Sequence, residues 1–171
     1  MTQRKNETSE IGILLRRLEI LEAERAILRL LHQYGQSLDA GDEESFVDCF
    51  TENGSFVASG TRPEHTTLTL TGRDELQAFA HSHTRRPVLF HQHCVIDPLI
   101  VFENSQATCR SNLIVIMEHD DCPVIRVFGR YLDKIVPQDD GKWRFAERIA
   151  VIDSMRAGLP QLAWGMPNGT G

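Results

Sequence analysis

The stretch YGQSLDAGDEESFVD, residues 34–48, joins two helical patterns and decides how the first third of the chain folds. Before it, apolar residues recur at steps of three and four from Glu10 to Ala40, which predicts an amphipathic helix or two consecutive ones. The run Asp39-Ala40-Gly41-Asp42 ends this helical pattern, and Asp42 can cap a second short helix. Asp39 is therefore expected where the first helix meets its neighbours.

The chain after Pro87 has the pattern of a β-sheet. Polar turn residues separate four long β-branched and aromatic runs: Val88–Glu103, Ala107–His119, Val124–Val136 and Trp143–Met155. Helices followed by a meander of long antiparallel strands are typical of an α+β fold. Strands of this length curl, so we expect a cone-shaped, mostly antiparallel sheet with the N-terminal helices packed across its concave face, enclosing a pocket.

Length and composition predict a single domain. The chain has 171 residues, enough to bury a core without disulfides or a metal, and we expect residues 10–157 to form the domain. Residues 1–9 are polar and are expected to be disordered, whereas residues 158–171 form a tail that covers a pocket mouth or contacts another subunit. The four cysteines, spread widely without a CxxC motif, are interpreted as reduced, buried thiols.

The charge and hydropathy of the chain argue against two classes of partner, nucleic acids and membranes. The chain carries 18 basic and 24 acidic residues, a net charge of −6, with no Lys/Arg cluster beyond pairs, which argues against nucleic acid. No apolar run approaches membrane-spanning length, and the polar N-terminus lacks the apolar core of a signal peptide. These features predict a cytoplasmic protein without a membrane partner.

Asp39 and His93 are the candidate catalytic residues. If they meet in a closed cavity, Asp39 can accept the Nδ1 proton of His93, fix its tautomer and leave Nε2 free as a base. Such a base suits removal of a proton activated by a carbonyl, hydroxyl or halide. Alternatively, Asp39 caps the following turn and His93 is a hydrogen-bonded core residue.

A metal site is the second possibility that the histidines raise. His81 with His83, and His91 with His93, form two HxH pairs. A strand places both members of such a pair on one face, but His83 is expected to end a helix, where residues two apart do not converge. No cluster of carboxylates accompanies the histidines. We therefore predict no metal, place His81 and His83 at a helix end or on the surface, and keep His91 as a possible pocket residue.

Several other residues are candidates for substrate contact. Tyr34 can donate a hydrogen bond to a substrate oxygen or simply pack in the core. Asn112, in mid-strand among apolar residues, is either a ligand contact or a bridge within the sheet. The candidate apolar walls, each of which can equally be core, are Phe56, Phe128, Met117, Met155 and Trp164. Arg130, Arg144 and Arg148 are interpreted as solvated or subunit-contact charges, and Tyr131 and Asp133 as structural.

Three segments of the chain resemble a known family. They are AERAILRLLHQYGQSLDAGDEESFVDCFTENGSF (residues 23–56), HCVIDPLIVFENSQATCRS (93–111) and GRYLDKIVPQDDGKWRFAERIAVID (129–153). They resemble the opening, the central hairpin and the last two strands of SnoaL-like proteins, which have the nuclear-transport-factor-like cone fold. Relatives include scytalone dehydratase, hexachlorocyclohexane dehydrochlorinase, polyketide cyclases, ketosteroid isomerase and the small subunit of ring-hydroxylating dioxygenases. The resemblance covers about residues 20–153.

The resemblance implies roles for Asp39 and His93. In the dehydratase and the dehydrochlorinase, an aspartate at the end of the first long helix orients a strand histidine that removes a proton, and no metal or cofactor takes part. Leu38 stands where the dehydratase has a tyrosine, and Gly129 or Arg130 where it has a second histidine. These departures argue against the dehydratase's way of positioning water.

Together, these observations predict a cofactor-independent enzyme of the lyase or isomerase type. Its reaction would be that of a dehydratase, dehydrohalogenase or cyclase, and its substrate a small apolar cyclic molecule. The alternative is a non-catalytic protein that binds a small molecule, or the small subunit of a ring-hydroxylating dioxygenase. The long first helix and the exposed sheet surface predict a homo-oligomer, either a dimer or a trimer; Leu14–Leu21 can pack on another subunit or on the chain's own sheet.

Overall fold

The α+β prediction is confirmed by the structure, a computed structural model that describes residues 2–61 and 68–155. The helices are α1 (Thr2–Ala40), α2 (Glu43–Asp48) and α3 (Gly72–Ser82). The strands are β1 (Phe50–Gly60), β2 (Leu68–Thr71), β3 (His91–Glu103), β4 (Gln106–His119), β5 (Cys122–Pro137) and β6 (Trp143–Met155). The predicted tail 158–171, with Trp164, lies outside the described residues.

The described strands form one curved sheet in the order β2-β1-β6-β5-β4-β3. β1 and β6 pair in parallel, and every other neighbouring pair is antiparallel. Register shifts interrupt the pairing of β3, β4, β5 and β6, as between Ile96 and Leu99, where Asp97 has a φ of 51°. Such bulges bend strands and increase their twist, which gives the sheet its concave face.

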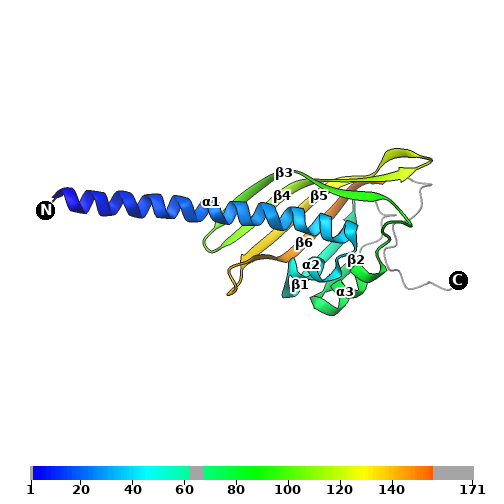
Figure 1. The fold of residues 1–171 in the computed structure, drawn as a ribbon, viewed down its shortest axis with the longest axis horizontal. Helices are drawn as coiled ribbons and strands as arrows, with labels where there is room; N and C mark the ends of the chain where they lie inside the picture. The colour runs from blue at the N-terminus through cyan, green and yellow to red at the C-terminus, as the bar shows by residue number, and fades with distance from the viewer. Residues whose placement is uncertain (1, 62–67, 156–171) are drawn as a thin grey trace.

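Helix α1 lies along this sheet and extends well beyond it (Figure 1). Its C-terminal half buries Ile27, Leu31, Tyr34 and Leu38, spaced three or four residues apart, so one stripe faces the sheet. The half that projects beyond the sheet carries exposed large apolar side chains between Ile11 and Leu21. Helix α1 begins at Thr2, so residues 2–9 are helical where the sequence predicted a disordered arm. They contain no proline or glycine that would stop the helix.

The core is rich in aromatic rings packed around Tyr34. Its ring centroid lies 5.3–6.3 Å from those of Phe46, Phe50, Phe56, Tyr131 and Phe145. Arg148 lies among these rings: its guanidinium carbon is 3.7 Å from the Tyr131 ring centroid and 4.1 Å from that of Tyr34. It is completely buried, so the prediction of a solvated or subunit-contact charge is wrong at this position. The inward register of β6, shared with Ala150 and Ile152, brings Arg148 into the core.

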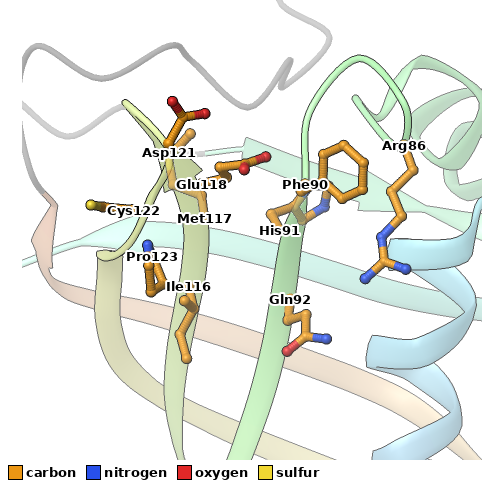
Figure 2. A pocket seen from close by; sticks show the side chains of 10 residues that line it. All are labelled: Arg86, Phe90, His91, Gln92, Ile116, Met117, Glu118, Asp121, Cys122 and Pro123. Carbon is orange, nitrogen blue, oxygen red and sulfur yellow. The ribbon is translucent and has the colours of Figure 1, made fainter.

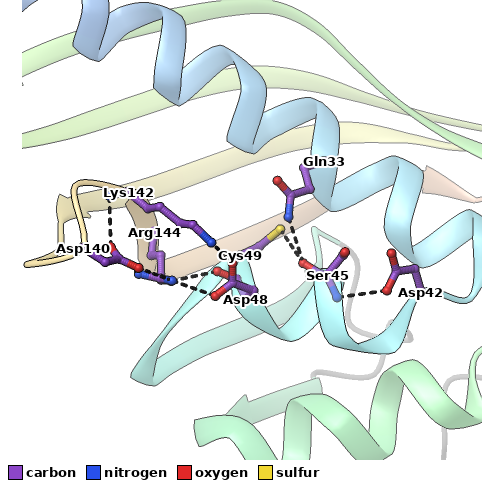
Figure 3. Close-up of polar contacts among 8 residues, drawn as sticks. All are labelled: Gln33, Asp42, Ser45, Asp48, Cys49, Asp140, Lys142 and Arg144. Carbon is purple, nitrogen blue, oxygen red and sulfur yellow. Dashed lines mark hydrogen bonds and ion pairs between the residues drawn. The ribbon is translucent and has the colours of Figure 1, made fainter.

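Polar contacts attach α2 to the turn between β5 and β6 (Figure 3). Arg144 bonds both Asp48, at the end of α2, and Asp140 in the turn, with Nη2–oxygen distances of 2.7 and 2.8 Å. Asp42 caps α2, as predicted, by accepting the Ser45 N–H at 3.1 Å. Among residues 2–61 and 68–155, the helices are too short or too polar to span a membrane.

Candidate active site

The structure brings Asp39 and His93 together. Asp39 Oδ1 lies 2.6 Å from His93 Nδ1, and Asp39 Oδ2 accepts the backbone N–H of His93 at 2.8 Å. The carboxylate therefore holds the histidine by its ring and its main chain at once. The two side chains are 17% and 8% exposed, so their contact is shielded from most of the solvent. Asp39 does not cap the following turn, because both of its carboxylate oxygens contact His93, and Asp42 caps α2 instead.

The end of α1 fixes the position of Asp39. The Gly41 N–H donates to the Leu38 carbonyl at 3.2 Å and the Asp42 N–H to that of Ser37 at 2.9 Å, with Gly41 at a φ of 74°. These two bonds form a Schellman motif, which requires a left-handed residue after the helix and so favours glycine. Asp39 thus lies in a closed last turn rather than in a frayed one.

Gly35 allows α1 to approach β3 closely. A Cβ added at Gly35 would lie only 2.9 Å from the carbonyl oxygen of His93, closer than side chains normally come. Gly35 lies one helical turn before Asp39, so the contact sets the distance between helix and strand beside the Asp39–His93 pair. A glycine in mid-helix lowers helix propensity. Its position here is explained by this close approach.

Two more histidines join the pair. His83 ends α3 and His91 begins β3, and their Nε2 atoms are 3.1 Å apart. His91 Nε2 is also 3.4 Å from Asp39 Oδ1. His83 lies at a helix end, as one of the two predicted alternatives has it, but it is only 5% exposed and so does not lie on the surface. Its burial at the helix C-terminus follows from packing against Phe79, one turn earlier.

Both additional histidines are held neutral. Burial, followed by the influence of His93 and His91, lowers the pKa of His83 to about 3. Burial and His93 also lower the pKa of His91. At neutral pH both imidazoles are therefore uncharged, with a ring nitrogen available to accept a proton, a hydrogen bond or a metal ion.

The concave face of the sheet encloses a small inner cavity of about 20 Å³. His83, His93 and Tyr34 line it together with apolar side chains that include Phe56, Phe79 and Leu113. This volume holds about one water molecule. The expected pocket is thus present, but side chains largely fill it.

Two larger surface hollows reach the histidines from outside. The first, of about 370 Å³, is lined by both Asp39 and His93, and we call it the helix hollow. The second, of about 350 Å³, is lined by His91 and by residues of β4 and β5, and we call it the strand hollow (Figure 2). Arg86 and Gln92 line both hollows. The Asp39–His93 pair therefore lies between an apolar interior and an open polar surface.

The other predicted contact residues divide into three groups. Tyr34 and Phe56 line the inner cavity, and burial raises the pKa of Tyr34 well above its usual value, which keeps the phenol protonated. Met117 and His91 line the strand hollow, and Met155 packs half-buried against the core. Asn112 and Phe128 lie on the exposed outer face, so their predicted pocket roles are wrong.

Alternation along the strands explains these errors. In β4 the residues Leu113, Val115 and Met117 point inward, which places Asn112 outward. In β5, Tyr131 and Asp133 point inward and Phe128 outward. The same argument applied to β6 would have found Arg148. His83 lies at the end of a helix, outside any strand alternation, so no such pattern predicts its burial.

Comparisons with known proteins identify the family and the fold of the chain. A family model described as a SnoaL-like domain matches residues 19–149. A solved protein of unknown function from Mycobacterium tuberculosis is 29% identical, with a TM-score of 0.68 over 84% of this chain and 76% of that one. No curated protein matches significantly.

Two solved structures from Novosphingobium aromaticivorans show the same fold. One is provisionally described as the β subunit of an aromatic-ring-hydroxylating dioxygenase; it is 19% identical, with a TM-score of 0.67 over 80% of this chain and 93% of that one. The other is provisionally described as a scytalone dehydratase; it is 22% identical, with a TM-score of 0.62 over 88% of this chain and 96% of that one.

Proposed function

Because the chain belongs to the SnoaL-like domain family, we propose that it is a cofactor-independent enzyme of the lyase or isomerase type, acting on a small apolar cyclic molecule. His93 is the general base and Asp39 orients it. The observation that carries this proposal is the double contact of Asp39 with the ring and the backbone of His93, at 2.6 and 2.8 Å.

The chemistry follows from the tautomer that Asp39 selects. A carboxylate that accepts the Nδ1–H leaves the lone pair on Nε2, and this nitrogen removes a proton from an activated C–H bond. The C–H electrons form a double bond, and either a leaving group departs with its electron pair or a neighbouring carbonyl becomes an enolate. Asp39 stabilises the imidazolium that results. The imidazolium then returns its proton to the departing hydroxide or to another carbon of the substrate.

The substrate's place follows from the linings of the two spaces that His93 borders. We assign the apolar ring to an expanded form of the inner cavity, where Phe56, Phe79 and Leu113 contribute to the walls. Its polar substituent fits the helix hollow, where Arg86 and Gln92 offer donors. Since the inner cavity now holds about one water molecule, binding requires the lining side chains to move apart.

A second candidate is a non-catalytic module, such as the small subunit of a ring-hydroxylating dioxygenase. It is favoured by the nearly filled interior and by the apolar outer face of the sheet, where Leu99, Ile125 and Phe128 are more than half exposed. A solved structure with this fold is itself provisionally described as a dioxygenase β subunit. A chain purified alone, active in proton exchange and without an iron-bearing partner, would exclude this candidate.

We also propose that the protein is a cytoplasmic homo-oligomer assembled in part through α1. Ile11, Leu14, Leu18 and Leu21 are spaced by three, four and three residues, and each is more than half exposed. This is the spacing of a coiled-coil seam. Arg17 and Glu22 flank the seam five residues apart, as required for an ion pair between parallel helices. The free thiols of all four cysteines agree with a reducing compartment.

The catalytic proposal is tested by hydrogen exchange. Cyclic ketones, phenols and halides are incubated with the protein in deuterated water, and NMR follows deuterium uptake or elimination. Replacing His93 by Gln should abolish the reaction while changing the unfolding free energy by no more than about 1–2 kcal/mol. His32→Gln, at an exposed position of α1, is the matched control. Full activity in His93→Gln would remove His93 from the mechanism.

A further inference from the structure

Three imidazoles face one another in the interior. His83 comes from the end of α3, and His91 and His93 from the same face of β3. Their ring centroids are 5.1 Å apart for His83 and His91, 5.6 Å for His83 and His93, and 5.4 Å for His91 and His93. One nitrogen from each ring lies within 4.8 Å of the other two. The general-base mechanism uses only His93, so the other two imidazoles have no role in it.

These distances are close to those of a three-histidine metal site. Zinc–nitrogen bonds of about 2.0–2.1 Å in tetrahedral geometry place the ligand nitrogens about 3.3 Å apart. The Nε2 atoms of His83 and His91 are already 3.1 Å apart. The third nitrogen needs to approach by no more than about 1.5 Å to complete the set.

The surroundings suit a metal ion as well. Histidine ligands commonly donate their second ring N–H to a carboxylate, which fixes the ring and strengthens the ligand. Asp39 holds His93 in this way, through Nδ1 at 2.6 Å, and leaves Nε2 as the ligand atom.

An ion can enter through the strand hollow. His91 lines this hollow, and so do Glu118 and Asp121, which lie on the side away from Arg86 (Figure 2). Two carboxylates near an opening raise the local concentration of cations, although Arg86 on the opposite side works against them. Of the three histidines, His91 lines this hollow, so an ion from outside would reach the cluster beside His91.

We propose that His83, His91 and His93 bind one divalent transition-metal ion, with Zn²⁺ as the best match, and that Asp39 supports the site through His93. Three protein nitrogens leave the fourth position of the ion to water. Bound in this way, the ion occupies the nitrogen that would otherwise act as the base. The metal site and the free base are therefore mutually exclusive states of one cluster, and the binding claim does not depend on the proposed reaction.

Direct metal binding tests the site. The full chain, stripped with a chelator and carrying His65→Gln to remove the one histidine outside the described residues, is titrated with Zn²⁺ against a chromogenic chelator. One equivalent should bind with a dissociation constant below about 1 μM. His83→Gln and His91→Gln should each weaken binding by about 100-fold or more, and Asp39→Asn by about 10- to 100-fold. His81→Gln, at an exposed position on α3, should leave affinity unchanged.

A spectroscopic measurement separates site loss from misfolding. Co²⁺ added to the parent protein should give the strong visible absorption of a four- or five-coordinate ion, and Zn²⁺ should remove it. Far-ultraviolet circular dichroism checks that each variant is folded. Binding weaker than about 100 μM, octahedral Co²⁺ spectra, or equal affinity in His81→Gln and His83→Gln would overturn the proposal. The 3.1 Å contact would then be a hydrogen bond between two neutral imidazoles.

Discussion

Replacing Gly35 by Ala tests whether the close approach of α1 to β3 sets the geometry of the Asp39–His93 pair, which we propose to be catalytic. The new Cβ would lie 2.9 Å from the His93 carbonyl oxygen and 3.5 Å from the His93 Cβ. Ordinary contact begins at 3.4 Å, so the oxygen must lie about 0.5 Å farther away. Since the obstacle is backbone, helix and strand must move apart, and the 2.6 Å contact between Asp39 and His93 lengthens with them.

Two opposing terms set the expected stability of Gly35→Ala. Alanine in mid-helix is favoured over glycine by about 1 kcal/mol. Overpacking against a fixed neighbour costs about 1–3 kcal/mol. The balance predicts a loss of about 0–2 kcal/mol in unfolding free energy, which urea denaturation can measure. Activity should fall more clearly than stability, because a displacement of a few tenths of an ångström misplaces the base by an amount that slows proton transfer.

Gly12→Ala provides the matched control in the same helix. No atom lies within 4 Å of a Cβ added there, so this variant gains helix propensity without a clash. The two variants differ mainly in the contact with His93. If Gly35→Ala were as stable and as active as Gly12→Ala, the close approach would not be needed and the explanation of Gly35 would be refuted.

Three further predictions follow from other contacts. Asp39→Asn should lower kcat/KM by about 10²- to 10⁴-fold with a folded chain, since the imidazole loses its orienting charge; an unchanged rate would contradict the tautomer argument. Burial raises the pKa of Asp133 to about 6, above its unfolded value, so ionising Asp133 destabilises the folded protein. The unfolding free energy of the parent protein, measured relative to that of Asp133→Asn, should therefore fall by up to about 3 kcal/mol between pH 4 and 6 and then stay constant. Urea titrations at these two pH values measure the change, and a difference that rises with pH would show the sign to be wrong. The double variant Leu14→Arg with Leu18→Arg should be monomeric when its mass is measured by light scattering. An unchanged oligomeric mass would show that the subunits associate through the sheet and not through α1.

The fold was accessible from the sequence because its signals are local or periodic, whereas the contact between Asp39 and His93 was implied by the family resemblance. The helix ending at Asp39-Ala40-Gly41 and the long β-runs after Pro87 each have a recognisable pattern, and Asp39 is placed by the first of them. The face of the sheet on which each strand residue lies was harder to predict, because a bulge interrupts the alternation of inward and outward side chains. In β5, for example, the consecutive residues Arg126 and Val127 are both buried. The burial of His83 was not predicted because it depends on how α3 lies against β3. This tertiary arrangement cannot be read from the spacing of residues in the sequence.

The parallel pairing of β1 with β6 has a consequence for biosynthesis. Phe56 lies beside Arg148, so an early strand completes its hydrogen bonding only when the last one has left the ribosome. Until then the apolar stripe of α1 and the first strand stay without their final neighbours, and closing so long a stretch of chain carries an entropic cost. Nascent chains that end before β6 should therefore be the ones most in need of chaperones.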